Sequence, residues 1–261
     1  AVRSNSSEIN RGMLNLQMPS RWKAEPQMFP VEFHRRGEEQ VFKFKVFPSD
    51  LKEGATDIQA VFTAGARKYS EGYSLVTRED LGSFYYFQPS VQRVSTVNVK
   101  VPKDLKVAYI MGAGDDIPAV LQQIGMNVTV IAADSLSSDK MAAANLSQYD
   151  TIVLGIRAYD TQKALVSSNK ALLDYVFNGG TLVTQYNASV TEFNSGRFSP
   201  YPAQLSRDRV SVEEAPVEIL AADESVFHFP NEITQQDFAH WVQERGLYFM
   251  DQWDANFKPL L

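Results

Sequence analysis

The sequence contains no cysteine and only three histidines among its 261 residues. Without thiols the chain can form no disulfide bond, no thiolate nucleophile and no cysteine-ligated zinc site. The histidines, His34, His228 and His240, are far apart in the sequence, which argues against a site with several histidine ligands. We therefore expect neither a bound metal ion nor a cofactor.

Long apolar runs and an excess of positive charge are also missing. No stretch approaches the roughly 18 apolar residues that a membrane-spanning helix needs, so no membrane span is expected. The net charge of −6 argues against a nucleic-acid partner, since nucleic-acid-binding surfaces are basic. The polar residues 1–5 are no signal peptide, and we expect any targeting segment to lie outside this sequence.

Residues 1–103 are predicted to form an all-β domain. Apolar and polar residues alternate along short segments, and turn signals such as Gly37, Gly54 and Gly82 separate them. No helical period interrupts this pattern, which is typical of an antiparallel β-sandwich. The expected strands cover residues 13–18, 41–47, 57–65, 72–77, 82–88 and 94–101.

The stretch GMLNLQMPSRWKAEP, the following Gly-Glu-Glu turn and the stretch VFKFKVFPS carry a resemblance within this half. They are similar to the small immunoglobulin-like modules appended to bacterial carbohydrate-active enzymes. The resemblance implies an immunoglobulin-like sandwich for residues 1–103. Trp22 then has two interpretations, a platform for stacking a sugar ring or a packed core residue, and we favour the core residue.

Residues 104–261 follow a different pattern, in which apolar strands alternate with helices. This order predicts an α/β domain with a parallel sheet and helices on both of its faces. No Gly/Ser-rich linker precedes it, so we expect the two domains to be packed rather than flexibly tethered. The expected strands cover 106–112, 127–134, 151–155 and 181–186, and the expected helices cover 117–125, 141–150 and 170–177.

The chain beyond Ser189 is rich in loops. Edge strands are expected within residues 210–220. A helix is expected over 233–246, because Thr234 and Asp237 match a capping box and glycine ends the pattern. An aromatic-rich segment, 247–261, follows it.

The sequence MGAGDD after the first parallel strand invites comparison with a dinucleotide-binding loop. Gly112 and Gly114 match the first two glycines of that motif, but Ile117 replaces the third. Asp115 and Asp116 put negative charge where a pyrophosphate needs a positive helix end. We therefore prefer a simple turn followed by a helix cap.

A covalent nucleophile is not evident in the sequence. Nucleophile elbows place Ser or Cys on the tight turn between a strand and a helix. Tyr186 occupies the corresponding position here, and no histidine is near it in the sequence. We expect no acyl-enzyme chemistry.

Polar side chains after the last two parallel strands define the candidate site, since such sheets bind ligands beyond the carboxyl ends of their strands. Arginine forks suit carboxylates, phosphates or paired sugar hydroxyls. The alternative is that the pairs within 207–209 and 244–245 are structural ion pairs. The predicted ligand-binding residues, none of them catalytic, are Arg157, Tyr159, Gln185, Tyr186, Asn187, Arg207, Arg209 and Arg245.

A second resemblance is carried by the stretches KVAYIMGAGDDIPAVLQQIG, VLGIRAYDT, NGGTLVTQYN, SPYPAQLSRDRVSVEEAPVEIL and DFAHWVQERGLYF. Together they resemble the C-terminal region of large bacterial PIG-L/LmbE-type deacetylases, where it follows a zinc-dependent N-acetylsugar deacetylase domain. The resemblance covers residues 104–261. It implies a flavodoxin-like sheet of the class I glutamine amidotransferase-like, or ThuA-like, kind. The deacetylase's His-Pro-Asp-Asp zinc motif is absent, and Tyr186 replaces the amidotransferase cysteine.

The resemblance implies a non-catalytic accessory region that positions the deacetylase or binds its glycan. The expected partners are a glycan and an upstream deacetylase domain of the same chain. The implied location is the periplasm or the cell surface. Two alternatives stay open: an independent small-molecule or hydrolytic site around Arg157 and Gln185, and a structural dimerisation module.

Overall fold

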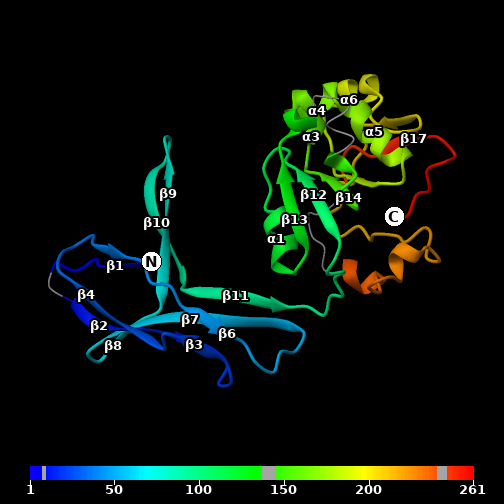
Figure 1. The fold of residues 1–261 in the computed structure, drawn as a ribbon. Helices are drawn as coiled ribbons and strands as arrows, with labels where there is room; N and C mark the ends of the chain where they lie inside the picture. The colour runs from blue at the N-terminus through cyan, green and yellow to red at the C-terminus, as the bar shows by residue number, and fades with distance from the viewer. Residues whose placement is uncertain (8–9, 137–144, 240–245) are drawn as a thin grey trace. The chain divides into compact units, whose positions relative to one another are not determined.

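The computed structural model describes residues 1–7, 10–136, 145–239 and 246–261. The chain divides into two compact units, Ala1–Asn98 and Val99–Leu261. Figure 1 shows strands in the first unit and strands with helices in the second. Each unit has a hydrophobic core of its own.

The N-terminal unit is an antiparallel β sandwich, as predicted. Its largest sheet has the order β11-β7-β2-β4, with β8 paired to β7. The strands of this sheet are β2 (Asn10–Gln17), β4 (Met28–Phe33), β7 (Gly54–Ala64), β8 (Arg67–Tyr69) and β11 (Val91–Thr96). The smaller pairs are β1 (Val2–Arg3) with β5 (Glu39–Gln40), β3 (Lys23–Glu25) with β6 (Lys45–Phe47), and β9 (Glu71–Arg78) with β10 (Gly82–Pro89).

The core of this unit follows from side chains that alternate along its strands. Phe33 and Phe62 lie in it, with their ring centroids 6.1 Å apart in an edge-to-face contact. Trp22 is only 9% exposed, and its indole N–H donates to the carbonyl of Ser49 at 3.0 Å. Trp22 is therefore a buried residue with a satisfied polar atom, in agreement with the core interpretation.

The segment 41–47 differs from the predicted continuous strand. Only its end belongs to a strand, β6, and residues 41–44 have no regular structure. Phe42 and Phe44 still pack on the ring of Phe29, at centroid distances of 5.2 and 4.9 Å. Contacts between rings therefore hold this segment, although it makes no ladder there. The last strand also lies earlier than predicted, because β11 ends at Thr96.

The strands β9 and β10 form a hairpin that stands away from the five-stranded sheet of its unit (Figure 1). They pair along their whole lengths. At the base of the hairpin the Ser90 hydroxyl contacts the carbonyl oxygens of Ala60 and Ser70 at 2.6 and 2.7 Å. All residues of β10 are exposed.

The C-terminal unit contains the predicted parallel sheet, with the strand order β13-β12-β14-β15. The central strand β12 is buried on both faces, as its apolar sequence requires. The edge strand β15 ends at Thr184, so Gln185 and Tyr186 lie in the following loop. The four strands are β12 (Lys106–Ile110), β13 (Asn127–Ile131), β14 (Thr151–Leu154) and β15 (Thr181–Thr184).

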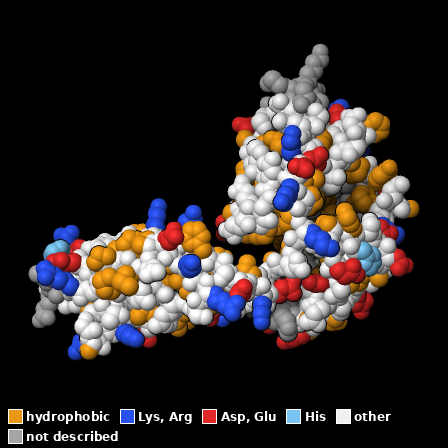
Figure 2. All heavy atoms as spheres, turned by 60° about the horizontal axis from the view of Figure 1, so that its bottom comes forward, with side chains coloured by type: hydrophobic (Ala, Val, Ile, Leu, Met, Phe, Trp, Pro, Cys, Tyr) orange, Lys and Arg blue, Asp and Glu red, His pale blue; other side chains and the backbone are white. Residues whose placement is uncertain are grey.

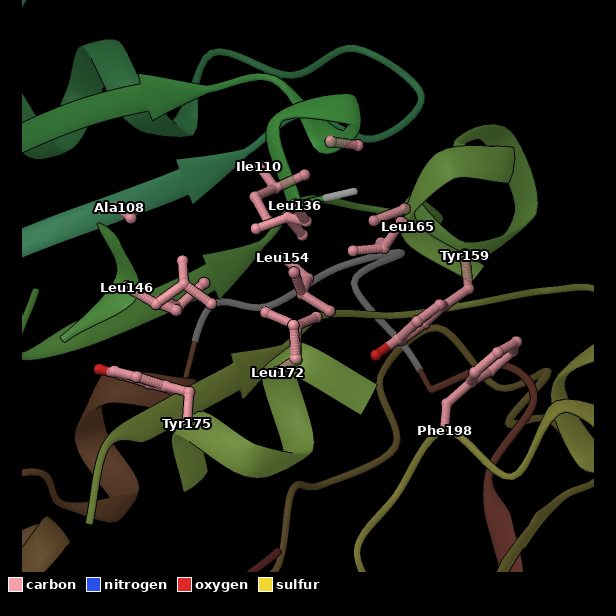
Figure 3. Close-up of a cluster of buried hydrophobic side chains, with 14 of the residues drawn as sticks. Ala108, Ile110, Leu136, Leu146, Leu154, Tyr159, Leu165, Leu172, Tyr175 and Phe198 are labelled. Atoms are coloured by element: carbon pink, nitrogen blue, oxygen red, sulfur yellow. The ribbon is translucent and has the colours of Figure 1, made fainter. Parts of the chain in front are cut away.

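Helices pack on both faces of this sheet (Figure 1). Tyr109 of β12 lies with Leu121 of α1 (Ile117–Gln123) on one face. The next residue, Ile110, lies with Leu172 of α5 (Asn169–Phe177) in the core of the other face (Figure 3). The other elements that the structure describes between β12 and β16 are η1 (Ala133–Leu136), α3 (Ala158–Thr161), α4 (Lys163–Ser167) and α6 (Val190–Gly196).

The C-terminal region corrects two predictions. Residues 190–196 form α6 rather than a loop. The edge strands expected within 210–220 are wrong, because this segment has no strand and its Ala215 amide donates to the Val212 carbonyl at 3.2 Å in a turn. The strands lie elsewhere, in the antiparallel pair β16 (Ala203–Leu205) and β17 (Met250–Trp253).

Two predicted helices fall partly on residues that the structure does not describe. Thr234 and Asp237 form the predicted capping box at the short 3-10 helix η3 (Gln235–Phe238). Residues 240–245 of that predicted helix lie outside the described residues, as do residues 141–144 of the helix predicted over 141–150. Another 3-10 helix, η2 (Ser225–Phe227), precedes η3.

Candidate functional site

The strand order reverses between β12 and β14, and doubly wound sheets bind ligands in the crevice at such a point. The loops that follow β12 and β14 meet directly at this point. The Ala113 amide donates to the Ile156 carbonyl at 2.7 Å, and the Gly155 amide donates to the Ile110 carbonyl at 2.8 Å. A Cβ atom on Gly112 would lie 1.9 Å from the Ile156 oxygen. Backbone contact therefore joins the two loops here, and Ile156 beside this contact also lines the large cleft described below.

Asp115 lies at the start of α1, where a dinucleotide would need a positive helix end. Its Oδ1 accepts hydrogen bonds from the Ile117 amide at 3.1 Å and the Tyr109 hydroxyl at 2.8 Å. Its Oδ2 is buried without a hydrogen-bond partner among the described residues. A carboxylate thus occupies the place that a pyrophosphate would take, which favours the turn and helix cap over a dinucleotide site.

Gln185 contacts the same tyrosine hydroxyl that donates to Asp115. Its side-chain amide donates to the Tyr109 hydroxyl at 2.9 Å. Burial, reinforced by the hydrogen bond to Asp115, raises the pKa of Tyr109 to about 12. Tyr109 is therefore a neutral hydroxyl that links two loops and is not poised to lose its proton near neutral pH.

Arg157 follows β14 with a left-handed φ of 58°, an uncommon conformation for a residue other than glycine. Its amide donates to the Tyr186 carbonyl at 2.6 Å, and its Nε donates to Asp160 at 3.0 Å. The Arg157 side chain is 45% exposed. Part of its guanidinium therefore serves an internal ion pair, while the rest faces solvent.

Asp160 is the buried partner of this arginine, with a side chain only 3% exposed. It also accepts hydrogen bonds from the amides of Ala188 and Ser189 at 2.9 and 3.2 Å. Burial alone would raise the pKa of Asp160, but these amides and Arg157 outweigh burial and hold the pKa below its ordinary value. Asp160 thus joins the loop after β14 to the loop after β15.

Tyr159 and Asn187 are also buried, at 6% and 4% exposure. The Tyr159 hydroxyl donates to Asn169 at 2.6 Å, and its ring stacks on Phe198 at a centroid distance of 4.0 Å (Figure 3). The Asn187 side chain accepts from the Tyr159 amide at 3.3 Å and donates to the Gln185 carbonyl at 3.0 Å. Burial raises the pKa of Tyr159. Both residues shape the site mainly through internal hydrogen bonds.

A large cleft adjoins these strand ends and has a volume of about 1630 Å³. It exceeds the roughly 300–1,000 Å³ of common small-molecule pockets. Figure 2 shows hydrophobic side chains gathered in a hollow of the C-terminal unit. Four predicted residues are among those lining the cleft: Tyr159, Gln185, Tyr186 and Asn187.

Aromatic side chains from the C-terminal segment form another part of the cleft wall. The ring of Tyr186 stacks on Tyr248 at a centroid distance of 5.9 Å. Phe249 and Trp253 also line the cleft, and they are 43% and 46% exposed. Sequence reasoning identified Tyr186 but missed these partners, for which the aromatic richness of 247–261 was the only available signal.

Among the predicted arginines that the structure describes, Arg157, Arg207 and Arg209 are not part of the cleft lining. Arg207 and Arg209 are exposed, and within the described ranges no ion pair involves either of them. Backbone hydrogen bonds hold their loop instead, since the Tyr248 amide donates to the Asp208 carbonyl at 2.8 Å. Arg245 lies outside the described residues, so its role stays a prediction.

The described part of the chain offers no group of three or more His, Asp or Glu side chains that could hold a metal ion. Nor does it contain a helix both long and apolar enough to cross a membrane. Comparisons with protein-family models, curated proteins and solved structures found no match for this chain.

Proposed function

We propose that this chain is a non-catalytic accessory region of a carbohydrate-active protein of the PIG-L/LmbE type, and that its C-terminal unit binds a glycan. The aromatic-lined cleft of about 1630 Å³ carries this proposal. Sugar rings combine apolar C–H faces with a rim of hydroxyls. Exposed rings such as Tyr186 and Trp253 offer flat surfaces for the C–H faces of a sugar, and Gln185 offers an amide for its hydroxyls. The size of the cleft suits several sugar units.

The state of the polar residues supports binding rather than covalent catalysis. Asp160 is already bonded to Arg157 and two backbone amides. Asn187 is bonded to Tyr159 and Gln185. Tyr186 stands where a nucleophile would be needed, and the chain has no cysteine. These groups are committed to holding the loops, so they are not available as an acid, base or nucleophile.

The finer fold assignment is part of the same proposal. The order β13-β12-β14-β15 is 2-1-3-4 in sequence terms, which agrees with the first four strands of the flavodoxin-like order. We assign residues 104–261 to an amidotransferase-like domain without its nucleophile, and residues 1–103 to an immunoglobulin-like sandwich. The proposal also includes an upstream deacetylase domain and a periplasmic or cell-surface location.

The test is a titration of the whole chain with soluble oligosaccharides of N-acetylglucosamine, in which calorimetry and tryptophan fluorescence measure the binding. We expect saturable binding that Trp253→Ala weakens about tenfold or more, taking for a stacked sugar ring the magnitude of about 1–3 kcal/mol that a nucleic-acid base gains on an aromatic ring. Tyr186→Ala should weaken binding in the same way. Tyr69→Ala, which removes an exposed ring of the N-terminal unit, is the matched control and should leave binding unchanged.

Two results would count against the proposal. If none of the tested oligosaccharides binds at millimolar concentration, the cleft does not have the proposed role in glycan binding. Turnover of a sugar amide or ester by the purified chain, abolished by Arg157→Ala or Gln185→Ala, would instead establish the alternative of an independent hydrolytic site.

A further inference from the structure

The hairpin of β9 and β10 exposes four consecutive aromatic residues. Phe84, Tyr85, Tyr86 and Phe87 are 51–61% exposed. Successive side chains of a strand point to opposite faces, so aromatic rings cover both faces of β10. Strands with apolar side chains on both faces are usually buried on both faces. An isolated two-stranded hairpin is only marginally stable in water.

The outer edge of β10 is also open. Among the described strands β10 pairs only with β9, so about half of its backbone N–H and C=O groups point outward. Edge strands are usually protected by lysine, proline, a bulge or an inward-pointing charge. The sequence GSFYYFQP has no charged residue, its only proline is the last residue, and its pairing is regular. This edge favours the addition of another strand.

The arrangement of the rings favours a protein strand over a sugar as the occupant. The rings of Tyr73 and Tyr85 are inclined at 88° to each other, and those of Tyr85 and Phe87 at 47°. A sugar stacks on a flat and open ring face. Tilted rings present edges and gaps, into which the side chains of a neighbouring strand can pack.

We propose that β10 pairs antiparallel with β10 of a second copy of this chain, across a two-fold axis. A two-fold contact must be complementary to itself, and an uncharged strand brings no like charges opposite each other. In an antiparallel pair, side chains directly opposite each other lie on the same face with Cβ atoms about 4.5–5.5 Å apart, so the rings of β10 pack beside side chains of the partner strand. The contact buries the sides of these rings and the backbone edge of β10, an area at the low end for specific interfaces, so we expect the dimer to form in concentrated solution.

The first test is the mass of the intact chain in solution, measured by light scattering and sedimentation over a wide range of concentration. We expect concentrated protein to show twice the 29.3 kDa of one chain. Tyr86→Lys and, separately, Phe84→Lys should weaken the association about tenfold or more, because each buries a charge at the interface. Phe177→Lys is the matched control, because Phe177 is 89% exposed in the C-terminal unit, and it should leave the dimer unchanged.

Hydrogen exchange of the wild-type chain provides a second measurement that needs no substitution. The outward-facing amides of β10 should be protected at high concentration and lose this protection on dilution, while amides of β7 stay protected throughout. A wild-type chain that remains a monomer overturns the proposal, and so does a dimer unaffected by both lysine variants. Protection of β10 that is independent of concentration also overturns it, because the cover would then come from the same chain. These readouts are independent of glycan binding, so either proposal can fail alone.

Discussion

Asp160 is the residue on which the geometry of the candidate site depends most directly. Its carboxylate receives the Nε–H of Arg157 and the amides of Ala188 and Ser189. Because one buried side chain bonds to the loops after both β14 and β15, it fixes the position of one strand end relative to the other. A neutral amide of the same shape can replace only part of this set, since its NH₂ group cannot accept.

Asp160→Asn should therefore lower the free energy of unfolding by about 2 kcal/mol at neutral pH, the usual loss for hydrogen bonds to a charged group. The pKa of Asp160 is lower in the folded state than in the unfolded state. Its contribution is thus complete above the unfolded pKa and is lost as the pH falls through the folded pKa. Urea denaturation at a series of pH values should show the variant and wild type converging in acid.

The control for this variant is Asp174→Asn. Asp174 forms an ion pair with Lys170, but its side chain is 50% exposed. Exposed ion pairs contribute little, so the change should stay within about 0.5 kcal/mol at every pH. A loss as large as that of Asp160→Asn would show that charge alone, rather than the buried hydrogen bonds, accounts for the effect.

At the scale of elements, the close contact between the loops after β12 and β14 fixes the two loops relative to each other beside the cleft. The backbone of Gly112 lies so close to Ile156 that only hydrogen fits at the position of a side chain. The contact is reinforced by the hydrogen bond from Ala113 to Ile156. It joins the two loops at the reversal of strand order, next to the large cleft that Ile156 and the residues after β15 line together.

Gly112→Ala should force these loops apart and break that hydrogen bond. We expect the free energy of unfolding to fall by about 3 kcal/mol, the upper part of the range for overpacking. Gly72→Ala is the control, because its added Cβ would meet no atom closer than 4.0 Å. Thermal and urea unfolding measure both. An equal and small effect of the two substitutions would contradict the close approach of the loops.

At the scale of the whole molecule, the two units have separate cores. Phe33 and Phe62 belong to a cluster made of N-terminal strands. Leu172 and Ile110 belong to a cluster made of the parallel sheet and its helices. No residue is shared between these clusters, so a cavity in one core removes packing from that unit alone.

Phe33→Ala and Leu172→Ala test this division. Each removes a side chain at most 1% exposed, and each should cost about 3–4 kcal/mol of the stability of its own unit. Hydrogen exchange should become faster in β2 and β7 for the first variant and in β12 and β14 for the second. Faster exchange in both units after either substitution would mean that the two cores unfold as one.

Much of the fold could be predicted because its signals are local. The alternation in segments such as 57–65 and the apolar run of 106–110 depend only on neighbouring residues and on the periods of strands and helices. The break in the segment 41–47 could not be predicted in this way. There the rings of Phe42 and Phe44 pack on Phe29, which belongs to another strand, and this contact overrides the local pattern.

The features of the candidate site also fall into those that local sequence predicts and those that depend on distant contacts. The sequence alone determined that polar residues and Tyr186 follow the parallel strands, and that no cysteine is present to act as a nucleophile there. Only the tertiary structure decided that Arg157 is engaged by Asp160, that Gly112 lies against the backbone of Ile156, and that Tyr186 meets Tyr248. These outcomes depend on contacts between segments far apart in the chain. The energies of such contacts come from packing and burial, which no local period encodes.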